Sequence, residues 1–170
     1  MKTLGIILII AAVGVLANMI YMGVVSNYQY SNTIFSNWSL ADKASTIAQK
    51  AEYMDKFVAA LQASGLQGTH SALYFPTPDN SFDQNFYALQ SLQGRLHDIQ
   101  KMDETSFAYQ TAIQQITAQE QGEAQNMLDV FEGCWLKVHY YWLWNIWLVL
   151  LQVLLIIGLP IVGSVIISDN

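Results

Sequence analysis

The chain is poor in cysteine and in charge, and each shortage excludes a class of protein. Cys134 is the one cysteine in 170 residues, so the chain forms no intramolecular disulfide framework and no zinc site built from several cysteines. We expect a buried thiol there, with a disulfide to a second copy of the chain as the alternative. Lys and Arg number 7 against 13 Asp and Glu. Nucleic acid is not an expected partner, because no basic patch is present to neutralise phosphates.

The chain also lacks the motifs of common catalytic and cofactor sites. It has no Walker loop, glycine-rich dinucleotide turn, nucleophile elbow or zinc-protease helix. No Glu is followed three residues later by His, the spacing that helical bundles use for di-iron sites. The sequence therefore predicts a protein that is not an enzyme, with no catalytic, cofactor-binding or metal-binding residues.

What the chain has in excess is apolar side chains. Hydrophobic residues make up 53% of it and charged residues 12%, which is too apolar for an ordinary soluble domain. The first long apolar run, residues 4–25, follows Lys2. A cleaved signal peptide is one interpretation, because Val15, Leu16 and Ala17 resemble a cleavage site. The run is nevertheless long enough to cross a membrane, so an uncleaved transmembrane helix over residues 1–25 is favoured.

A second apolar run lies near the other end of the chain. Residues 143–167 carry no charge over 25 positions, and a membrane-spanning helix needs about 20. We predict a transmembrane helix over residues 142–167, followed by a short tail over residues 168–170. Aromatic rings gather just upstream, and such amphipathic rings settle at the headgroup level of a bilayer. The predicted membrane-interface belt consists of Trp135, Tyr140, Tyr141, Trp142, Trp144 and Trp147.

The charges that flank the two runs predict an orientation. Lys2 precedes the first run, whereas the tail over residues 168–170 carries no positive charge. Positive residues favour the cytoplasmic side, and loops longer than about 60 residues cross the membrane largely regardless of charge. The expected protein is a two-pass integral membrane protein with both termini cytoplasmic and residues 26–141 extracytoplasmic.

Polar residues inside the predicted spans suggest an interface. Asn18 lies in the first span, and Asn145 and Gln152 lie seven positions apart in the second, on one helical face. An amide without a partner is costly in hydrocarbon, and an interhelical bond between amides is worth about 0.6 to 2 kcal/mol. Gly14 shares the side of Asn18 and would let a neighbouring backbone approach. We therefore predict that these four residues pack the spans against each other or against a partner.

The sequence predicts that the segment between the spans is mainly helical. Apolar residues recur at alternating spacings of four and three over residues 39–63, which predicts a helix with a packed face. Residues 64–81 contain two glycines and two prolines and are predicted to be a loop. Further helices are predicted over about 82–101 and 105–141. The predicted fold is all-α, with two transmembrane helices flanking an extracytoplasmic helical bundle or a long bent helical hairpin.

These two arrangements differ in where the chain turns. In the hairpin, the first helix continues unbroken from the membrane and the returning arm bends. In the preferred four-helix bundle, the returning arm breaks near Asp103 and Gly122, and the even number of crossings brings the chain back to the membrane.

An acidic stretch is the strongest candidate for partner docking in this middle segment. Residues 102–135 contain six acidic side chains and no basic one. A solvated helix face is the ordinary interpretation, and a docking surface for a basic partner is the alternative. Two aromatic residues in the predicted loop are unusually apolar for an exposed turn. The candidate docking residues are Glu120, Glu123, Asp129, Glu132, Tyr74 and Phe75.

Two functions fit this layout. The first is a structural or accessory subunit of a membrane complex, with the lipid bilayer and other membrane subunits, or a second copy of the chain, as partners. The second is an extracytoplasmic sensor or ligand-binding module. Three residues precede the first apolar run. With so short a tail, we expect a sensor to signal through a partner's membrane helices.

Overall fold

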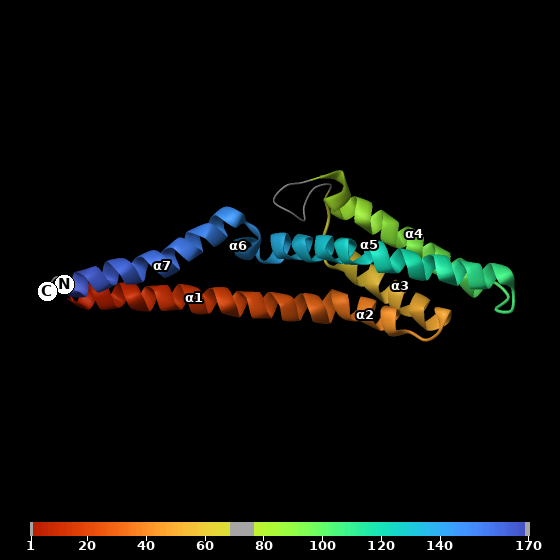
Figure 1. Ribbon diagram of the computed structural model, residues 1–170, viewed down its shortest axis with the longest axis horizontal. Helices are drawn as coiled ribbons and strands as arrows, with labels where there is room; N and C mark the ends of the chain where they lie inside the picture. Colours follow the sequence, from red (N-terminus) through yellow and green to blue (C-terminus); the bar gives the residue numbers. More distant parts are fainter. Residues whose placement is uncertain (1, 69–76, 169–170) are drawn as a thin grey trace. The chain divides into compact units, whose positions relative to one another are not determined.

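The computed structural model describes residues 2–68 and 77–168, and over these residues the fold is entirely helical (Figure 1). The prediction of an all-α chain is confirmed for this part, whereas Tyr74 and Phe75 lie outside it. The elements in order are α1 (Lys2–Tyr30), the π-helical turn η1 (Ser31–Phe35), α2 (Ser36–Lys43), α3 (Ile47–Ala63), the 3-10 turn η2 (Pro78–Asn80), α4 (Phe82–Gln100), α5 (Phe107–His139), α6 (Tyr141–Trp144) and α7 (Ile146–Ser168).

The chain divides into two compact units. Residues 1–28 and 139–170 form one unit, which we call the apolar unit, and residues 29–138 form the other, which we call the helical unit. Each unit is described by itself below.

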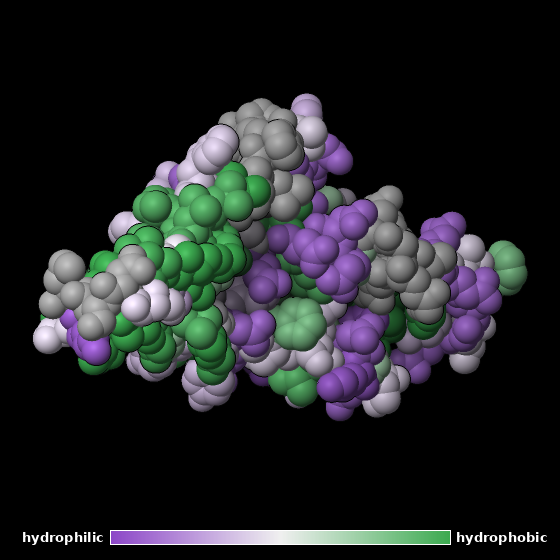
Figure 2. All heavy atoms as spheres, turned by 60° about the vertical axis from the view of Figure 1, so that its left-hand side comes forward, coloured by the Kyte–Doolittle hydropathy of each residue, from purple (hydrophilic) through white to green (hydrophobic). Residues whose placement is uncertain are grey.

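Two helical stretches are long and apolar enough to cross a membrane. They are Lys2–Lys43 and Ile146–Ser168, and only 11% and 6% of their most apolar windows are buried by the rest of the chain. Hydrophobic side chains accordingly cover much of the surface of the apolar unit in Figure 2. The prediction of two long apolar helices is confirmed.

One π-helical turn keeps a single face of the first helix buried as it enters the helical unit. Tyr30, Ile34 and Trp38 recur every four residues and are at most 8% exposed. In a regular α-helix of 3.6 residues per turn, such a spacing rotates by about 40° at each step. The wider π turn takes up this rotation because it holds more residues per turn. The three side chains therefore all stay buried, with Tyr30 against Trp135 and Trp38 against Phe57.

The helix predicted over residues 39–63 is divided in the structure. Ala44 is extended, with φ −65° and ψ 132°, and separates α2 from α3. The Thr46 hydroxyl then accepts a hydrogen bond from the backbone N–H of Gln49 at 3.2 Å and caps the start of α3. The apolar spacing continues through Ala44, but a side-chain cap at Thr46 competes with an unbroken helix.

The break predicted near Gly122 is absent. Helix α5 runs without interruption over 33 residues, although the turn near Asp103 is present. A glycine inside a helix costs only about 1 kcal/mol, which tertiary packing readily offsets. The helical unit therefore has its additional turn between α2 and α3 and not near Gly122. Helix α3 packs against both α2 and α4.

Aromatic rings form the centre of the helical unit. Phe57 of α3 and Phe131 of α5 are fully buried, with ring centroids 6.0 Å apart. Trp38 of α2 lies 5.5 Å from Phe57, and Phe82 of α4 lies 5.5 Å from Phe131. These edge-to-face pairs are a favourable geometry for aromatic packing. Four helices therefore contribute to one core.

Candidate partner-binding surfaces

Two glycines bring α1 and α7 into backbone contact in the apolar unit. A Cβ atom added at Gly5 would lie 2.5 Å from the carbonyl oxygen of Gly163, and one added at Gly163 would lie 2.7 Å from that of Gly5. Only glycine permits so close an approach, which is a common way for membrane helices to pack. Sequence reasoning did not single out this pair, because a glycine in one apolar run does not reveal which glycine of the other run it meets.

A groove of about 530 Å³ lies between α1 and the α6–α7 segment. It brings together three of the four residues that were predicted to form an interface, namely Gly14, Asn18 and Gln152. Nothing lies within 4 Å of a Cβ atom added at Gly14, so the backbone of α1 is open to the groove there. The other lining residues are Ala11, Val15, Met22, Trp142, Leu151 and Leu155.

The two amides in this groove do not bond to each other. The Asn18 side-chain N–H₂ lies 3.4 Å from the sulfur of Met22, one turn along the same helix. The Gln152 side-chain N–H₂ donates to the backbone carbonyl of Trp142 at 3.1 Å. Neither side-chain carbonyl oxygen accepts a hydrogen bond from any residue in the described ranges. The groove therefore presents two amide oxygens as acceptors, and each amide also keeps one N–H that no residue in the described ranges accepts.

Asn145 has a different position from the one predicted. It lies between α6 and α7 with extended backbone, so it does not share a helical face with Gln152. Its side-chain oxygen accepts from the backbone N–H groups of Trp147 at 3.0 Å and Leu148 at 3.4 Å, and its N–H₂ donates to the Tyr141 hydroxyl at 2.7 Å. Asparagine is a preferred N-cap, and capping α7 takes precedence over facing the groove.

The predicted aromatic belt is divided between the two units. Trp135 is only 6% exposed and its ring lies 6.2 Å from that of Tyr30 within the helical unit. Trp135 therefore lies in a core and not at the membrane interface that was predicted for it. The reason is that Trp135 belongs to the buried apolar face of α5. Trp142 and Trp147 are 54% and 75% exposed, and Tyr141 stacks on Trp144 at 5.9 Å. Interfacial positions for residues 140–147 stay a prediction.

The acidic stretch is described in part. Asp129 is exposed and accepts a hydrogen bond from Gln125 at 2.7 Å. Glu132 is half-buried, and burial, followed by the charge of Asp129, raises its pKa. The side chains of Glu120 and Glu123 lie outside the described side chains. Partner docking at this surface stays a prediction.

Comparisons with known proteins provide no relative. No family model, curated protein or solved structure matches the chain. Among the described side chains, those of residues 2–68, 77–116 and 124–168, no three His, Cys, Asp or Glu groups are arranged as metal ligands are. Cys134 is buried, as the sequence predicts.

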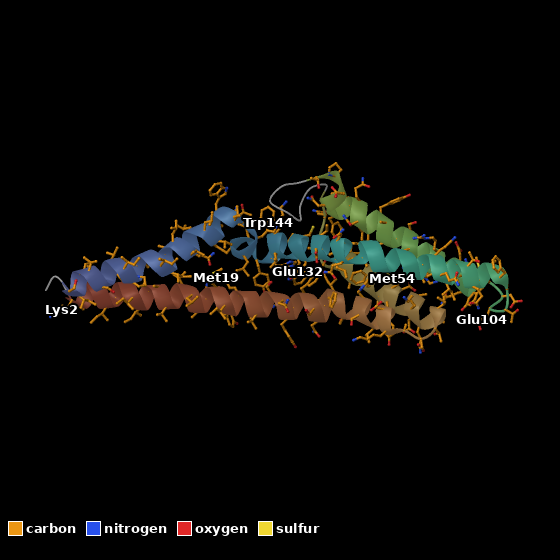
Figure 3. All side chains as sticks on the ribbon, in the orientation of Figure 1. Lys2, Met19, Met54, Glu104, Glu132 and Trp144 are labelled. Atoms are coloured by element: carbon orange, nitrogen blue, oxygen red, sulfur yellow. The ribbon has the colours of Figure 1, made fainter. Side chains whose placement is uncertain are left out.

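A second groove, of about 860 Å³, lies in the helical unit, where the ends of α2, α3, α4 and α5 meet. Ile47, Ile113 and Ile116 give it apolar walls, and Asp42 and Glu104 give it acidic groups. Figure 3 marks Glu104 in the connection between α4 and α5. Sequence reasoning did not predict this groove, because its residues come from helix ends that are distant along the chain.

A polar pair outside both grooves joins α3 to α4. The Asp55 carboxylate lies 2.8 Å from Nε2 of His97 and accepts from Gln93 at 2.6 Å, while Nδ1 of His97 lies 3.0 Å from the Gln100 side-chain oxygen. The hydrogen bond to Asp55, followed by that to Gln100, raises the pKa of His97. Burial acts to raise the pKa of Asp55, but hydrogen bonds from Gln93 and His97 outweigh it and lower that pKa.

Proposed function

We propose that the protein is a two-pass integral membrane protein that acts as a structural or accessory subunit of a membrane complex. The observation that carries this proposal is the amide-lined groove between α1 and the α6–α7 segment. A chain whose spans formed a finished pair would satisfy Asn18 and Gln152 within itself. This one leaves their side-chain oxygens without partners and leaves most of its apolar helix surface uncovered.

The proposed topology places both termini in the cytoplasm and the helical unit outside it as a helical bundle. Lys2 before the first span supports this orientation. Asp129, which is exposed, and Glu132, which is half-buried, then provide acidic groups for a basic partner, and the sequence adds Glu120 and Glu123 to the same acidic stretch. A cysteine introduced at Tyr87, which is 73% exposed, tests the orientation. A membrane-impermeant maleimide should label this cysteine in intact cells. Labelling only after lysis would show that the orientation is the opposite of the proposed one.

Assembly is tested in the native membrane. The tagged full chain should migrate on native gels in mild detergent as a complex larger than the monomer, with a second protein in fixed stoichiometry. A tag placed on that second protein should recover this chain in return. Migration as a monomer, with no protein recovered in both directions, would refute the accessory-subunit proposal.

An extracytoplasmic ligand-binding module is the second candidate function, and the 860 Å³ groove in the helical unit favours it. Small-molecule sites usually have volumes of about 300 to 1,000 Å³, apolar walls and a few polar groups. Binding of small amphipathic compounds to the full chain in nanodiscs should raise its thermal midpoint. The variant Ile113→Trp, which fills the groove, should lose that shift. Equal shifts in both proteins would exclude the groove as a ligand site.

A further inference from the structure

We infer that the bend between α6 and α7 is a hinge held by two side-chain amides, those of Asn145 and Gln152, and that α6 and α7 become one straight helix when these amides release it. The inference goes beyond the proposed function, because it concerns two shapes of a single chain and names no partner. All residues of the hinge belong to the apolar unit.

No residue at the bend forces the backbone to turn. Residues 141–157 contain neither proline nor glycine, and no residue other than glycine has a positive φ in the described ranges. Pro160, by contrast, lies inside α7 without ending it. The bend arises because Tyr140, with φ −136° and ψ 54°, and Asn145, with φ −82° and ψ 115°, leave the helical region. Both residue types also adopt helical angles, so the backbone itself permits a straight helix.

The hydrogen bond of Gln152 belongs to the bent shape alone. Its side-chain N–H₂ donates to the backbone carbonyl of Trp142 at 3.1 Å, ten positions earlier. In a straight helix, ten positions span about 15 Å, which a glutamine side chain does not reach. The same carbonyl would instead accept from the backbone N–H of Ile146, four positions later. The Gln152 bond therefore distinguishes the two shapes.

Asn145 exchanges partners in the same way on the other side of the bend. Its side-chain oxygen accepts from the backbone N–H groups of Trp147 at 3.0 Å and Leu148 at 3.4 Å. In a straight helix these two groups would donate to the carbonyls of Leu143 and Trp144. A break in a membrane helix is tolerated where other groups satisfy the freed backbone. Because straightening exchanges these hydrogen bonds and does not lose them, the element has two shapes of similar stability.

The hinge also determines the shape of the groove beside it. Trp142 lines the groove together with Leu151 and Gln152 of α7, because α6 folds back beside α7. A straight helix would place Trp142 about 14 Å from Leu151 along the axis, nine positions away. The groove that carries the proposed function is therefore complete only in the bent shape.

Spin labels on the full chain in nanodiscs test the inference. The labels replace the side chains of Trp142 and Leu154, which are 54% and 67% exposed, and leave the Trp142 carbonyl in place. In the double variant Asn145→Ala, Gln152→Leu, we expect the labels to move apart to the separation of a straight helix, about 18 Å between Cα atoms. Asn18→Leu is the matched control and should leave the separation unchanged, because the Asn18 amide bonds only within α1.

Hydrogen exchange provides a second readout. Asn145→Ala alone should quicken exchange at the Trp147 amide, because the cap is gone while Gln152 still holds the bend. Adding Gln152→Leu should slow that exchange again, because a straight helix supplies the Leu143 carbonyl as acceptor. A general loss of stability would instead quicken exchange further in the double variant.

Two results would overturn the inference. One is a double variant whose label separation equals that of the natural chain, and the other is a Trp147 amide that exchanges faster in it than in Asn145→Ala. Unchanged circular dichroism and an unchanged separation of labels on the exposed positions Ile10 and Val162 would establish that the double variant is folded. Should it not fold, Asn145→Ala with Gln152→Asn keeps an amide of shorter reach in α7, and the same two results apply to it.

Discussion

The two units hold their helices together by opposite means. In the helical unit, large side chains such as Phe57 and Phe131 are fully buried and fill the space between helices. In the apolar unit, α1 and α7 approach through Gly5 and Gly163, where there is no side chain between the backbones. The first solution uses the hydrophobic effect, which requires water around the molecule. The second depends on close backbone packing, which remains effective where the solvent is itself apolar.

The two units also differ in how far along the chain the hydrogen-bond partners of their polar side chains lie. In the helical unit, the Tyr30 hydroxyl donates at 3.1 Å to the carbonyl of Leu128, far away along the chain. In the apolar unit, Asn18 and Asn145 bond only within about one turn of their own positions. Polar groups also fix the fold of the apolar unit, through the Asn145 cap and the bond from Gln152 to Trp142, but the side-chain oxygens of Asn18 and Gln152 accept no hydrogen bond from the described residues.

Removing a core ring should give the largest effect and would test this comparison directly. Phe131→Ala takes away the ring that packs on both Phe57 and Phe82. We expect the free energy of unfolding to fall by about 3 to 5 kcal/mol, as for other buried Phe-to-Ala changes. Thermal unfolding of the full chain in nanodiscs measures it. Trp147→Ala, at a side chain 75% exposed, is the control and should change little.

A methyl group at the glycine contact should have the next largest effect. Gly163→Ala places a Cβ atom 2.7 Å from the carbonyl oxygen of Gly5 and 3.1 Å from Cγ1 of Ile9. Overpacking of this kind costs about 1 to 3 kcal/mol and should move α1 and α7 apart. Spin labels on the exposed positions Ile10 and Val162 measure that separation.

The matched control for this change lies on the same helix. Gly158→Ala adds the same methyl group where nothing lies within 4 Å, so the label separation should not change. Equal separations in both variants would mean that the glycine contact does not hold the two helices together.

The part of the fold that sequence reasoning predicted well is the part whose signals are local. The predicted helix over about 82–101 corresponds to α4, because the apolar stripe from Phe82 to Ile99 and the Ser81 cap lie within one stretch of chain. The two apolar helices were likewise predicted from composition alone. Local pattern and observed structure agree wherever no distant contact intervenes.

The features that sequence reasoning missed are two local helix caps and one contact between residues far apart along the chain. The spacing that predicted an unbroken helix through Ala44 is present, yet Ala44 is extended and the Thr46 cap begins a new helix. Trp135 resembles the interfacial rings that follow it, but its contact with Tyr30 places it in a core. Gln152 lines the groove, whereas Asn145, which was predicted to share its helical face, caps α7. In each case two structures satisfy the apolar pattern. A side-chain cap decides between them at Thr46 and Asn145, and a tertiary contact decides at Trp135.

Removing a helix cap should give a smaller and more local effect in each unit. Thr46→Ala deletes the acceptor for the N–H of Gln49, and Asn145→Ala deletes the acceptor for that of Trp147. Loss of a cap typically costs about 1 kcal/mol. Hydrogen exchange should therefore quicken at those amides and leave Phe131 unaffected. Thr46→Ser retains the hydroxyl and is the control, and equally rapid exchange in it would exclude capping as the cause.

The Asp55–His97 pair should contribute least, and only in one unit, but its pH dependence is distinctive. The pKa of His97 is raised, so its contribution is complete below the unfolded pKa and is lost as the pH rises through the folded one. The pKa of Asp55 is lowered, so its contribution is complete above the unfolded pKa and is lost as the pH falls through the folded one. The pair therefore stabilises the fold most between about pH 4 and 6.5.

Exposure limits the size of this contribution. The two side chains are 41% and 43% exposed, and Lys101 opposes the charge of His97, so we expect less than about 1 kcal/mol. The measurement is the difference in free energy of unfolding between the natural chain and His97→Gln across pH. It should be largest in the stated window and shrink on both sides. The separation of labels on α1 and α7 should not follow it, because Gly5 and Gly163 carry no titrating group. A difference in free energy of unfolding that does not depend on pH would show that His97 contributes only through packing. A label separation that followed pH would show that the packing of α1 and α7 depends on titrating groups as well as on the glycine contact.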